Sequence, residues 1–520
     1  MVEFLRQHAA SVIGVINGFD RLRFRGTWLR IANTAGLSSF LSYMGVLLKD
    51  AGQWMNARTE QVKKASLAVA ESQGRPVVYV NDPSARKEDM AREIAQRDRI
   101  KEGLVCVLTA VEPCVSFDIH RNRAKKQLEL VSRWRKCLHL YHYYQHPQFG
   151  LMHMRLQTWF PFNLWCCING REWLARQLDE AGIGYLKREN CLVSVADVGR
   201  AQELADQQVR TNWAGVLNPI MAKVNPLHGE LFPDYPMNYY WSCQDSEWAS
   251  DVMFRSPEAL AGLYPHLIRH GMLNMSCEQI MRFLGRKEPT VGGKYGTFAG
   301  EVVSDLKYRP EGIRLKHYVN GNSVKMYDKQ GSVLRFETTI IQPGDFKVFR
   351  GTEEEPEKKA WRQMRKGVAD LQRRAEVSQA SNDRYAEAMA TAHCGKSVKE
   401  LAEGVCQRKT ESGRSVRALN PLGEEDARLL ETVNRGEFTL RGFRNGEVRE
   451  HLYAKPTSDV KEQKKRSAAV TRKLRLLRAH GLIKKVPKTH RYVLTTRGRE
   501  IIATLLAARS ADAKTLLKAA

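Results

Sequence analysis

The stretch NSVKMYDKQGSVLRFETTI, residues 322–340, decides how the middle of the chain folds. Two runs rich in β-branched, aromatic and other apolar residues flank Asp328-Lys329-Gln330-Gly331, which has the composition of a tight turn. A type I turn with Gly331 in the left-handed conformation predicts a β-hairpin with a three-residue loop.

The register of this hairpin determines which polar side chains meet. The predicted pairs are Tyr327 with Val333, Lys325 with Arg335, and Ser323 with Glu337. We therefore expect one face of the hairpin to carry four polar residues, Tyr327, Lys325, Arg335 and Glu337. A tyrosine that cleaves DNA needs such neighbours, because cations bind and polarise the scissile phosphate and a carboxylate holds a divalent metal ion.

The runs VKMYDK and LRFET within this stretch carry a resemblance to a known family. The hairpin resembles the active-site hairpin of rolling-circle replication initiators of the transposase-like Rep family and, more loosely, the nicking proteins of filamentous phages. That resemblance implies that Tyr327 is a nucleophile forming a phosphotyrosine link to DNA and that Glu337 is a metal ligand, with Mg²⁺ or Mn²⁺ as cofactor. The alternative is an ordinary hairpin in which Tyr327 packs and Glu337 pairs with Lys325.

Further acidic residues extend the candidate metal site. In NYYWSCQDSEWASDVMF, residues 238–254, Glu247 and Asp251 are four apart and share one face of a helix; they also share a face in a strand, because their separation is even. The alternative is an acidic helix N-terminus. Asp20 lies in an expected strand, GFDRLRFRG, and RNase H-like nucleases begin a two-metal site in this way, so Asp20, Asp251 and Glu337 form a second candidate set. A surface ion pair with a neighbouring arginine is the other interpretation of Asp20.

The patterns along the chain predict an α+β protein with a large mixed body, antiparallel strands and a helical connector. Residues 1–350 form the expected body, with a possible subdomain split near 200–235, and 351–422 the connector and linker. Strands are expected in 11–31 and, separated by Glu112-Pro113, in 104–119. Residues 423–510 form a separate module, followed by a basic tail at 511–520.

The residue pattern of the C-terminal module predicts three helices, two short strands around a basic loop, and a last helix. Its run LRAHGLIKKVPKTHRYVLTTRG resembles the helix–Gly–strand–wing–strand pattern of the winged helix-turn-helix domains of bacterial regulators, including the MarR-like ones. The resemblance implies that helix 461–479 enters a DNA major groove and that the wing meets phosphates. The nucleic-acid-binding candidates are Lys465, Arg466, Arg472, Lys473, Arg475, Lys484, Lys485, Lys488 and Arg491. The alternatives are protein contacts and a solvated basic face.

The charge of the chain points to a polyanionic partner. The 520 residues carry a net charge of +26, and residues 455–520 alone contain 18 Lys and Arg against 4 Asp and Glu. The sequence has no stretch of 18 apolar residues and no secretion signal, so nucleic acid is favoured over a membrane surface. Ten cysteines without a CxxC spacing predict reduced thiols in a cytoplasm, and a zinc site has no spacing to support it.

An aromatic and basic stretch, 133–165, is a candidate for stacking single-stranded bases. Its aromatic residues are Trp134, Tyr141, Tyr143, Tyr144 and Trp159, among Arg133, Arg135, Lys136 and Arg155. The alternative is that these aromatics form the core of a sheet. The histidines at 139, 142, 146 and 153 are expected to be hydrogen-bonded polar groups rather than metal ligands.

Together these features predict a mobile-element type of nucleic-acid enzyme that nicks DNA or transfers strands with a metal ion. Its expected partners are duplex DNA, single-stranded DNA and, as a further candidate, structured RNA. The alternatives are a non-catalytic DNA- or RNA-binding regulator, and a two-metal RNase H-like nuclease or RNA-associated mobile-element protein without a covalent intermediate.

Overall fold

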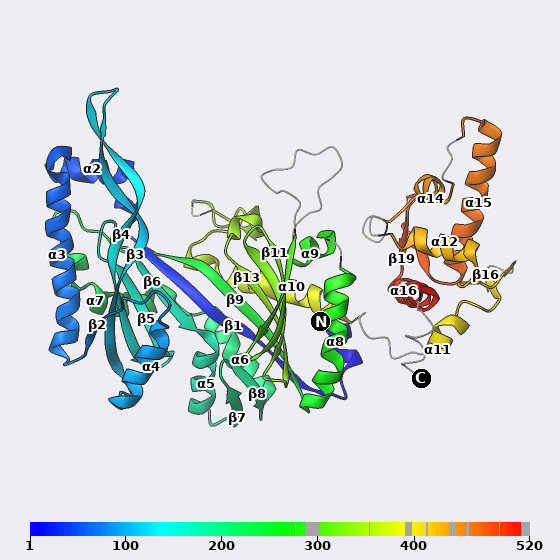
Figure 1. The fold of residues 1–520 in the computed structure, drawn as a ribbon, viewed down its shortest axis with the longest axis horizontal. Helices are drawn as coiled ribbons and strands as arrows, with labels where there is room; N and C mark the ends of the chain where they lie inside the picture. The colour runs from blue at the N-terminus through cyan, green and yellow to red at the C-terminus, as the bar shows by residue number, and fades with distance from the viewer. Residues whose placement is uncertain are drawn as a thin grey trace. The chain divides into compact units, whose positions relative to one another are not determined.

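The chain divides into two compact units, each described by itself. The computed structural model describes residues 1–275, 277–285, 302–352, 354–390, 398–411, 414–435, 438, 442–453, 457–487 and 489–510. The sheet unit comprises Met1–Tyr264 and Met281–Ala386, and the C-terminal unit comprises Pro265–Ile280 and Glu387–Ala520. Both are shown in Figure 1.

The sheet unit is built on one large, mostly antiparallel sheet, as the α+β prediction required. Its strands, from edge to edge, are β10 (Val303–Arg309), β11 (Gly312–Val319), β12 (Asn322–Lys329), β13 (Val333–Ile340), β9 (Tyr240–Phe254), β1 (Val12–Thr27), β6 (Leu164–Asn169), β5 (Gly150–Gln157), β4 (Gln127–His146), β3 (Gly103–Asn122) and β2 (Val77–Tyr79). Among the strands that the structure describes in this sheet, only the pairing of β2 with β3 is parallel. Strands more than 200 residues apart in the chain, β1 and β9, therefore become neighbours at the centre, and β9 also pairs with β13 on its other side.

Helices and short hairpins cover parts of both faces of this sheet. They are α1 (Val2–Gln7), α2 (Thr34–Tyr43), α3 (Leu48–Ser72), α4 (Lys87–Arg97), α5 (Gly170–Glu180), α6 (Val198–Val209), α7 (Trp213–Val224) and α10 (Leu371–Met389), with the hairpin β7 (Tyr185–Arg188) and β8 (Cys191–Val195). Two further helices, α8 (Pro257–Leu273) and α9 (Cys277–Phe283), each contain residues of both units. Figure 1 shows α3 running along the end of the sheet formed by β3 and β4. The α5 and α6 helices pack on β1.

The central strand β1 confirms the strand expected in residues 11–31 and contains a bulge at Asp20. Phe19 pairs with Trp248 and Arg21 pairs with Glu247, so Asp20 is an extra residue on β1. Apolar residues on either side of the bulge, Phe19 and Leu22, are buried in the main core. The bulge directs Asp20 toward the polar face of the sheet, where it meets β9 and β13.

Two sequence expectations about strands are corrected. Residues 104–119 form part of a single strand, β3, rather than two strands separated at Glu112-Pro113. Proline is tolerated there because β2 pairs only with Val107–Thr109, which leaves that side of β3 without a partner strand at Pro113. Residues 240–254 form β9 and not a helix, so the interpretation of 238–254 as a strand is the right one.

The predicted register of the 322–340 hairpin is wrong by two residues. Tyr327 pairs with Arg335, Lys325 with Glu337, and Ser323 with Thr339. The turn is centred on Gln330 and Gly331, both with positive φ (57° and 68°), and the Ser332 N–H donates to the Lys329 carbonyl at 3.2 Å. Asp328 and Lys329 therefore stay in β12. An even shift leaves each side chain on its predicted face.

The expected helical connector at 351–422 is also corrected. Residues 347–363 contain a hairpin, β14 (Lys347–Arg350) with β15 (Ala360–Gln363), and α10 is packed on the sheet. The buried Asn382 of α10 donates to the backbone carbonyls of Trp248 and Phe336 at 3.1 Å, and its own amide oxygen accepts from Thr338 at 2.7 Å. This helix therefore belongs to the body, because it closes one face of β9 and β13.

The C-terminal unit contains the helices and the hairpin expected from its sequence. Its elements are α11 (Val398–Glu403), β16 (Lys409–Glu411), β17 (Arg414–Val416), α12 (Glu424–Val433), α14 (Asn445–Leu452), α15 (Val460–Ala479), β18 (Ile483–Lys485), β19 (Tyr492–Leu494) and α16 (Thr496–Ser510). They share one apolar core, to which α15 contributes Val470, Leu474 and Leu477. The expected basic tail, 511–520, lies outside the described residues.

Candidate active site on the central sheet

Polar side chains form rows across neighbouring strands on the sheet face opposite α10. One row consists of Lys316 on β11, Lys325 on β12 and Glu337 on β13; the next consists of Arg314, Tyr327, Arg335 and, on β9, Asp251. A third row joins Thr339 to Glu247 and then to Arg21 on β1. Strand alternation places each row on the same face, so the antiparallel pairing gathers residues from five strands into one site.

Three carboxylates come together at the centre of this face. Asp20, Glu247 and Glu337 each place a carboxylate oxygen so that these atoms all lie within 4.8 Å of one another. All three residues are buried. Such a spacing is compatible with a shared divalent cation, because oxygen ligands are what Mg²⁺ and Mn²⁺ prefer.

Two buried cations and one exposed arginine neutralise these carboxylates in the structure. The Lys325 ammonium contacts Glu337 and lies 3.3 Å from Glu247. The Arg335 guanidinium donates to Asp20 at 2.7 Å and to Asp251 at 2.6 Å, and Arg21 donates to Glu247 at 2.8 Å. The cluster is therefore an ion-pair network, and the pairing of Glu337 with Lys325 that the ordinary-hairpin interpretation required is present.

The carboxyl groups differ in proton affinity. Burial raises the pKa of Glu337 to about 7, against the pull of Lys325, and the negative charges of Glu247 and Asp20 add to the increase. Burial acts in the same direction on Asp20, but the charges of Arg335 and Arg171 outweigh it, so the pKa of Asp20 is lowered. Glu337 is thus the carboxyl of this group that exchanges its proton near neutral pH.

Tyr327 lies among cations at the edge of the carboxylate group. Its register partners are Arg314 and Arg335, and the ammonium groups of Lys329 and Lys325 lie 4.9 and 5.9 Å from the centre of its ring. Within the described part of the chain its hydroxyl makes no hydrogen bond. Burial raises the pKa of Tyr327 in spite of Lys325 and Arg314, so its hydroxyl is protonated at neutral pH.

Most of the predicted site residues lie together on this face of the sheet. Asp251 lies on the same face but contacts different side chains. Asp251 is held by the buried guanidinium groups of Arg335 and Arg171, the latter at 3.0 Å. It lies outside the group formed by Asp20, Glu247 and Glu337. In the structure, the third carboxylate beside Asp20 and Glu337 is therefore Glu247 and not Asp251.

Sequence reasoning did not find several residues of this site. Arg171 comes from α5, and the turn between β7 and β8 supplies the Asn190 carbonyl, which accepts from Arg335 at 2.8 Å. No local pattern marks either residue, because their partners are 80 to 170 residues away in the chain. Arg314 and Lys316 could have been found, since they alternate with apolar residues in a strand that follows a turn. Burial and then the neighbouring charge of Lys325 lower the pKa of Lys316 to about 8.

The C-terminal candidates divide into exposed and paired residues. On α15, Lys465, Arg472 and Arg475 are exposed, while Arg466 bonds Glu462 at 2.9 Å and Lys473 pairs with Glu425. In the basic hairpin that follows, Lys484 and Lys485 on β18 are exposed and Arg491, just before β19, is half-buried. Lys488 lies outside the described residues.

The aromatic stretch 133–165 is mostly sheet core. Tyr141, Tyr143 and Tyr144 are buried, whereas Trp134 is 74% exposed. A tryptophan not singled out from the sequence, Trp165, is half-buried and has the guanidinium groups of Arg155 and Arg25 at 4.0 and 5.6 Å from its ring.

Comparison of the chain with protein-family models, curated proteins and solved structures finds no match at the level that indicates kinship. None of the helices described is both long and apolar enough to cross a lipid bilayer. The chemistry of this protein therefore has to be argued from its own side chains.

Proposed function

We propose that this protein binds DNA and cleaves one strand, with Tyr327 as nucleophile and with Mg²⁺ or Mn²⁺ bound by Asp20, Glu247 and Glu337. The observation that carries the proposal is the position of Tyr327. Its hydroxyl has no partner among the described side chains, cations surround its ring, and Glu337 lies diagonal to it in the hairpin register. The cations suit a phosphodiester, which needs positive charge as its transition state develops.

In the proposed step the Tyr327 oxygen bonds to phosphorus and the bond from phosphorus to one flanking DNA oxygen breaks. The tyrosine proton is released to solvent, and the leaving oxygen takes up a proton. A divalent ion held by Asp20, Glu247 and Glu337 would supply positive charge to the phosphoryl oxygens. Arg314 and Lys316, on the neighbouring strand, are the cations that we propose to bind the flanking phosphates, for which Arg314 would have to exchange its ion pair with Asp305 at 2.9 Å.

The exposed basic residues of α15 support the second part of the proposal, docking on duplex DNA. Lys465, Arg472 and Arg475 lie on one side of a helix whose other side is buried in the core of the C-terminal unit. A short basic hairpin, β18 with β19, follows it. This order of helix and hairpin is the basis for assigning a winged helix-turn-helix, with α15 in the major groove.

A non-catalytic nucleic-acid-binding protein is the second candidate, and one observation favours it. The Lys325 ammonium already bridges Glu247 and Glu337, so a divalent ion has to compete with it. In that case the ion-pair network only holds β9, β12 and β13 together, and the protein acts as a regulator of DNA or RNA.

The test is incubation of the full chain with labelled single-stranded DNA or supercoiled DNA plus Mg²⁺ or Mn²⁺. The proposal predicts a covalent protein–DNA adduct that Tyr327→Phe abolishes. The matched control is Tyr318→Phe, because Tyr318 lies on the same face of the adjacent strand, β11. Cleavage without an adduct, lost in Asp20→Ala, would show a two-metal nuclease instead. Binding to DNA or to structured RNA without cleavage, with Mg²⁺ or with Mn²⁺, would support the non-catalytic regulator.

A further inference from the structure

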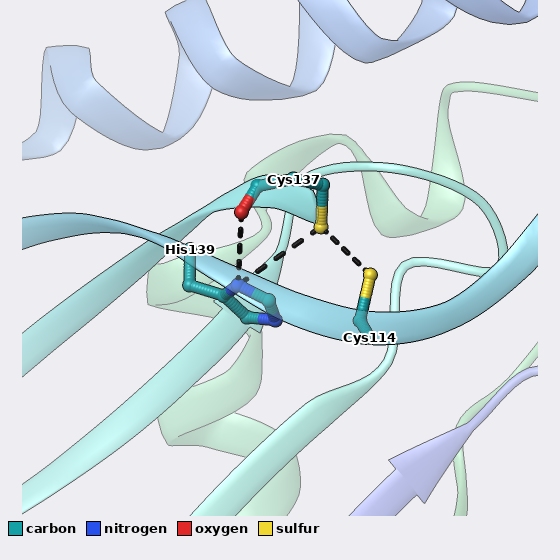
Figure 2. A group of neighbouring side chains, drawn as sticks. All are labelled: Cys114, Cys137 and His139. Atoms are coloured by element: carbon teal, nitrogen blue, oxygen red, sulfur yellow. Dashed lines mark hydrogen bonds between the residues drawn. The ribbon is translucent and has the colours of Figure 1, made fainter. Parts of the chain in front are cut away.

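A second group of chemically reactive side chains lies away from the carboxylates, on strands β3 and β4. It consists of Cys114 on β3 and of Cys137 and His139 on β4 (Figure 2). Cys137 and His139 are two residues apart and so share one face of β4. Cys114 lies diagonally opposite Cys137, since Cys114 pairs with Arg135 and Cys137 pairs with Glu112.

The donor atoms of this group nearly have the spacing of ligands around one ion. The two Sγ atoms are 3.0 Å apart, Cys137 Sγ is 3.9 Å from His139 Nδ1, and all three donor atoms lie within 4.8 Å of one another. Tetrahedral zinc, with bonds of about 2.3 Å to sulfur and 2.0 Å to nitrogen, places neighbouring ligand atoms about 3.5–3.8 Å apart. Small side-chain rotations that separate the sulfurs by about 0.8 Å therefore complete the geometry.

The surroundings of the group suit a soft divalent ion. Cys114 and His139 are buried. In the structure His139 Nδ1 donates to the Cys137 carbonyl at 3.2 Å (Figure 2), and Nε2 makes no hydrogen bond within the described residues, so binding of a metal at Nδ1 requires the ring proton to move to Nε2. Two thiolates neutralise the charge of a divalent ion, which reduces the cost of placing it in a buried site. Cys137 also lines a cavity of about 290 Å³, bounded in addition by Glu60 and Trp159, from which water can supply a fourth ligand.

We propose that Cys114, Cys137 and His139 bind one zinc ion, releasing two thiol protons to solvent and leaving the fourth position to water. Sulfur and imidazole ligands select zinc over Mg²⁺ and Mn²⁺, so this site is distinct from the carboxylate group on β1, β9 and β13. The rival outcome is a disulfide between Cys114 and Cys137, which requires the sulfurs to approach to about 2.05 Å and an oxidant to remove two electrons.

The experiment measures the metal content of the full chain, purified with a phosphine reductant and without chelator. The site predicts about one zinc per chain, together with visible and near-ultraviolet thiolate–cobalt bands after replacement by Co²⁺. Cys114→Ser and Cys137→Ser abolish both signals, and His139→Ala weakens zinc affinity by at least about 10-fold. Cys167→Ser is the matched control, because Cys167 is a half-buried cysteine on β6 of the same sheet.

Two results would overturn the zinc site. One is a zinc content near zero in the wild type after zinc is supplied, with no cobalt bands. The other is a wild-type protein that, denatured without reductant, alkylates at two fewer of its ten cysteines than the reduced protein and loses this difference in Cys114→Ser. Circular dichroism of each variant shows whether a loss of metal reflects unfolding.

Discussion

At the scale of single residues, Lys325 determines the character of the site. Its ammonium bridges two buried carboxylates, Glu247 and Glu337, at the position that we propose for a metal ion. The alternation of VKMYDK and LRFET placed Lys325, Tyr327, Arg335 and Glu337 on one face, because even separations keep side chains together. The exact partners depended on the turn geometry at Gln330, which local sequence does not determine.

Replacing this lysine tests whether the carboxylates can hold a metal. Lys325→Met leaves Glu247 and Glu337 without their shared cation, so the free energy of unfolding should fall by about 3–5 kcal/mol. Added Mn²⁺ should then raise the melting temperature of the variant more than that of the wild type, because the ion takes the place of the ammonium. Calorimetry of the variant and the wild type, in buffer without divalent metal and in the same buffer with Mn²⁺, measures both effects.

The control for this experiment is Lys316→Met, which removes a neighbouring lysine that contacts no carboxylate of the group. If Mn²⁺ stabilises neither variant beyond the wild type, the three carboxylates are not a metal site and the metal-dependent part of the proposal fails.

At the scale of elements, α15 was predictable and α10 was not. The apolar residues of α15 recur at helical spacing and its charges lie on the other side, a pattern that local sequence carries by itself. Residues 371–389 also carry many charges, and their sequence predicted an outer connector helix. Their polar residues, Arg374 and Asn382, instead bond to the backbone of β9 and β13, and such nonlocal partners leave no periodic signal.

The docking role of α15 makes a prediction about salt. Lys465→Ala/Arg472→Ala should weaken binding to a duplex oligonucleotide, and the slope of log affinity against log salt should become shallower by about 2. Fluorescence anisotropy over a series of salt concentrations measures the slope. Lys399→Ala/Arg408→Ala removes two exposed cations elsewhere in the C-terminal unit and should leave the slope unchanged. If both double variants changed the salt slope equally, a specific contact between α15 and DNA would be contradicted.

At the scale of the whole molecule, the site exists because the sheet orders its strands as β12, β13, β9 and β1. Asp20 and Glu337 are more than 300 residues apart, and no local pattern indicates that their strands flank β9. The sequence indicated the strands around Asp20 and in the 322–340 hairpin, together with antiparallel pairing, but it left residues 238–254 open between helix and strand. The strand order, and with it the choice of Glu247 over Asp251, required the three-dimensional structure.

Three buried or half-buried histidines of the sheet unit predict loss of stability in acid. Burial lowers the pKa values of His142, His153 and His317 to about 4, so the unfolded chain, with a pKa near 6.5, binds more protons. Stability is then lost as the pH falls from 6.5 toward 4, by about 2 kcal/mol per histidine at pH 5. Glu337, whose pKa is raised to about 7, acts in the opposite direction and offsets roughly one histidine.

The net expectation is a free energy of unfolding about 4 kcal/mol lower at pH 5 than at pH 7.5. Urea unfolding followed by tryptophan fluorescence at the two pH values measures the difference. His317→Gln should show a shallower dependence on pH than the wild type, and equal wild-type stability at the two pH values would contradict this assignment of neutral, buried histidines.

The measurement that tests the central claim most directly is the identification of the residue that carries DNA. The full chain is incubated with single-stranded DNA and Mn²⁺, digested with nuclease and protease, and its peptides are analysed by mass spectrometry. The account predicts a nucleotide attached to Tyr327, in the peptide that contains residues 326–329. A nucleotide on another residue, or DNA cleavage with no modified peptide, would contradict it.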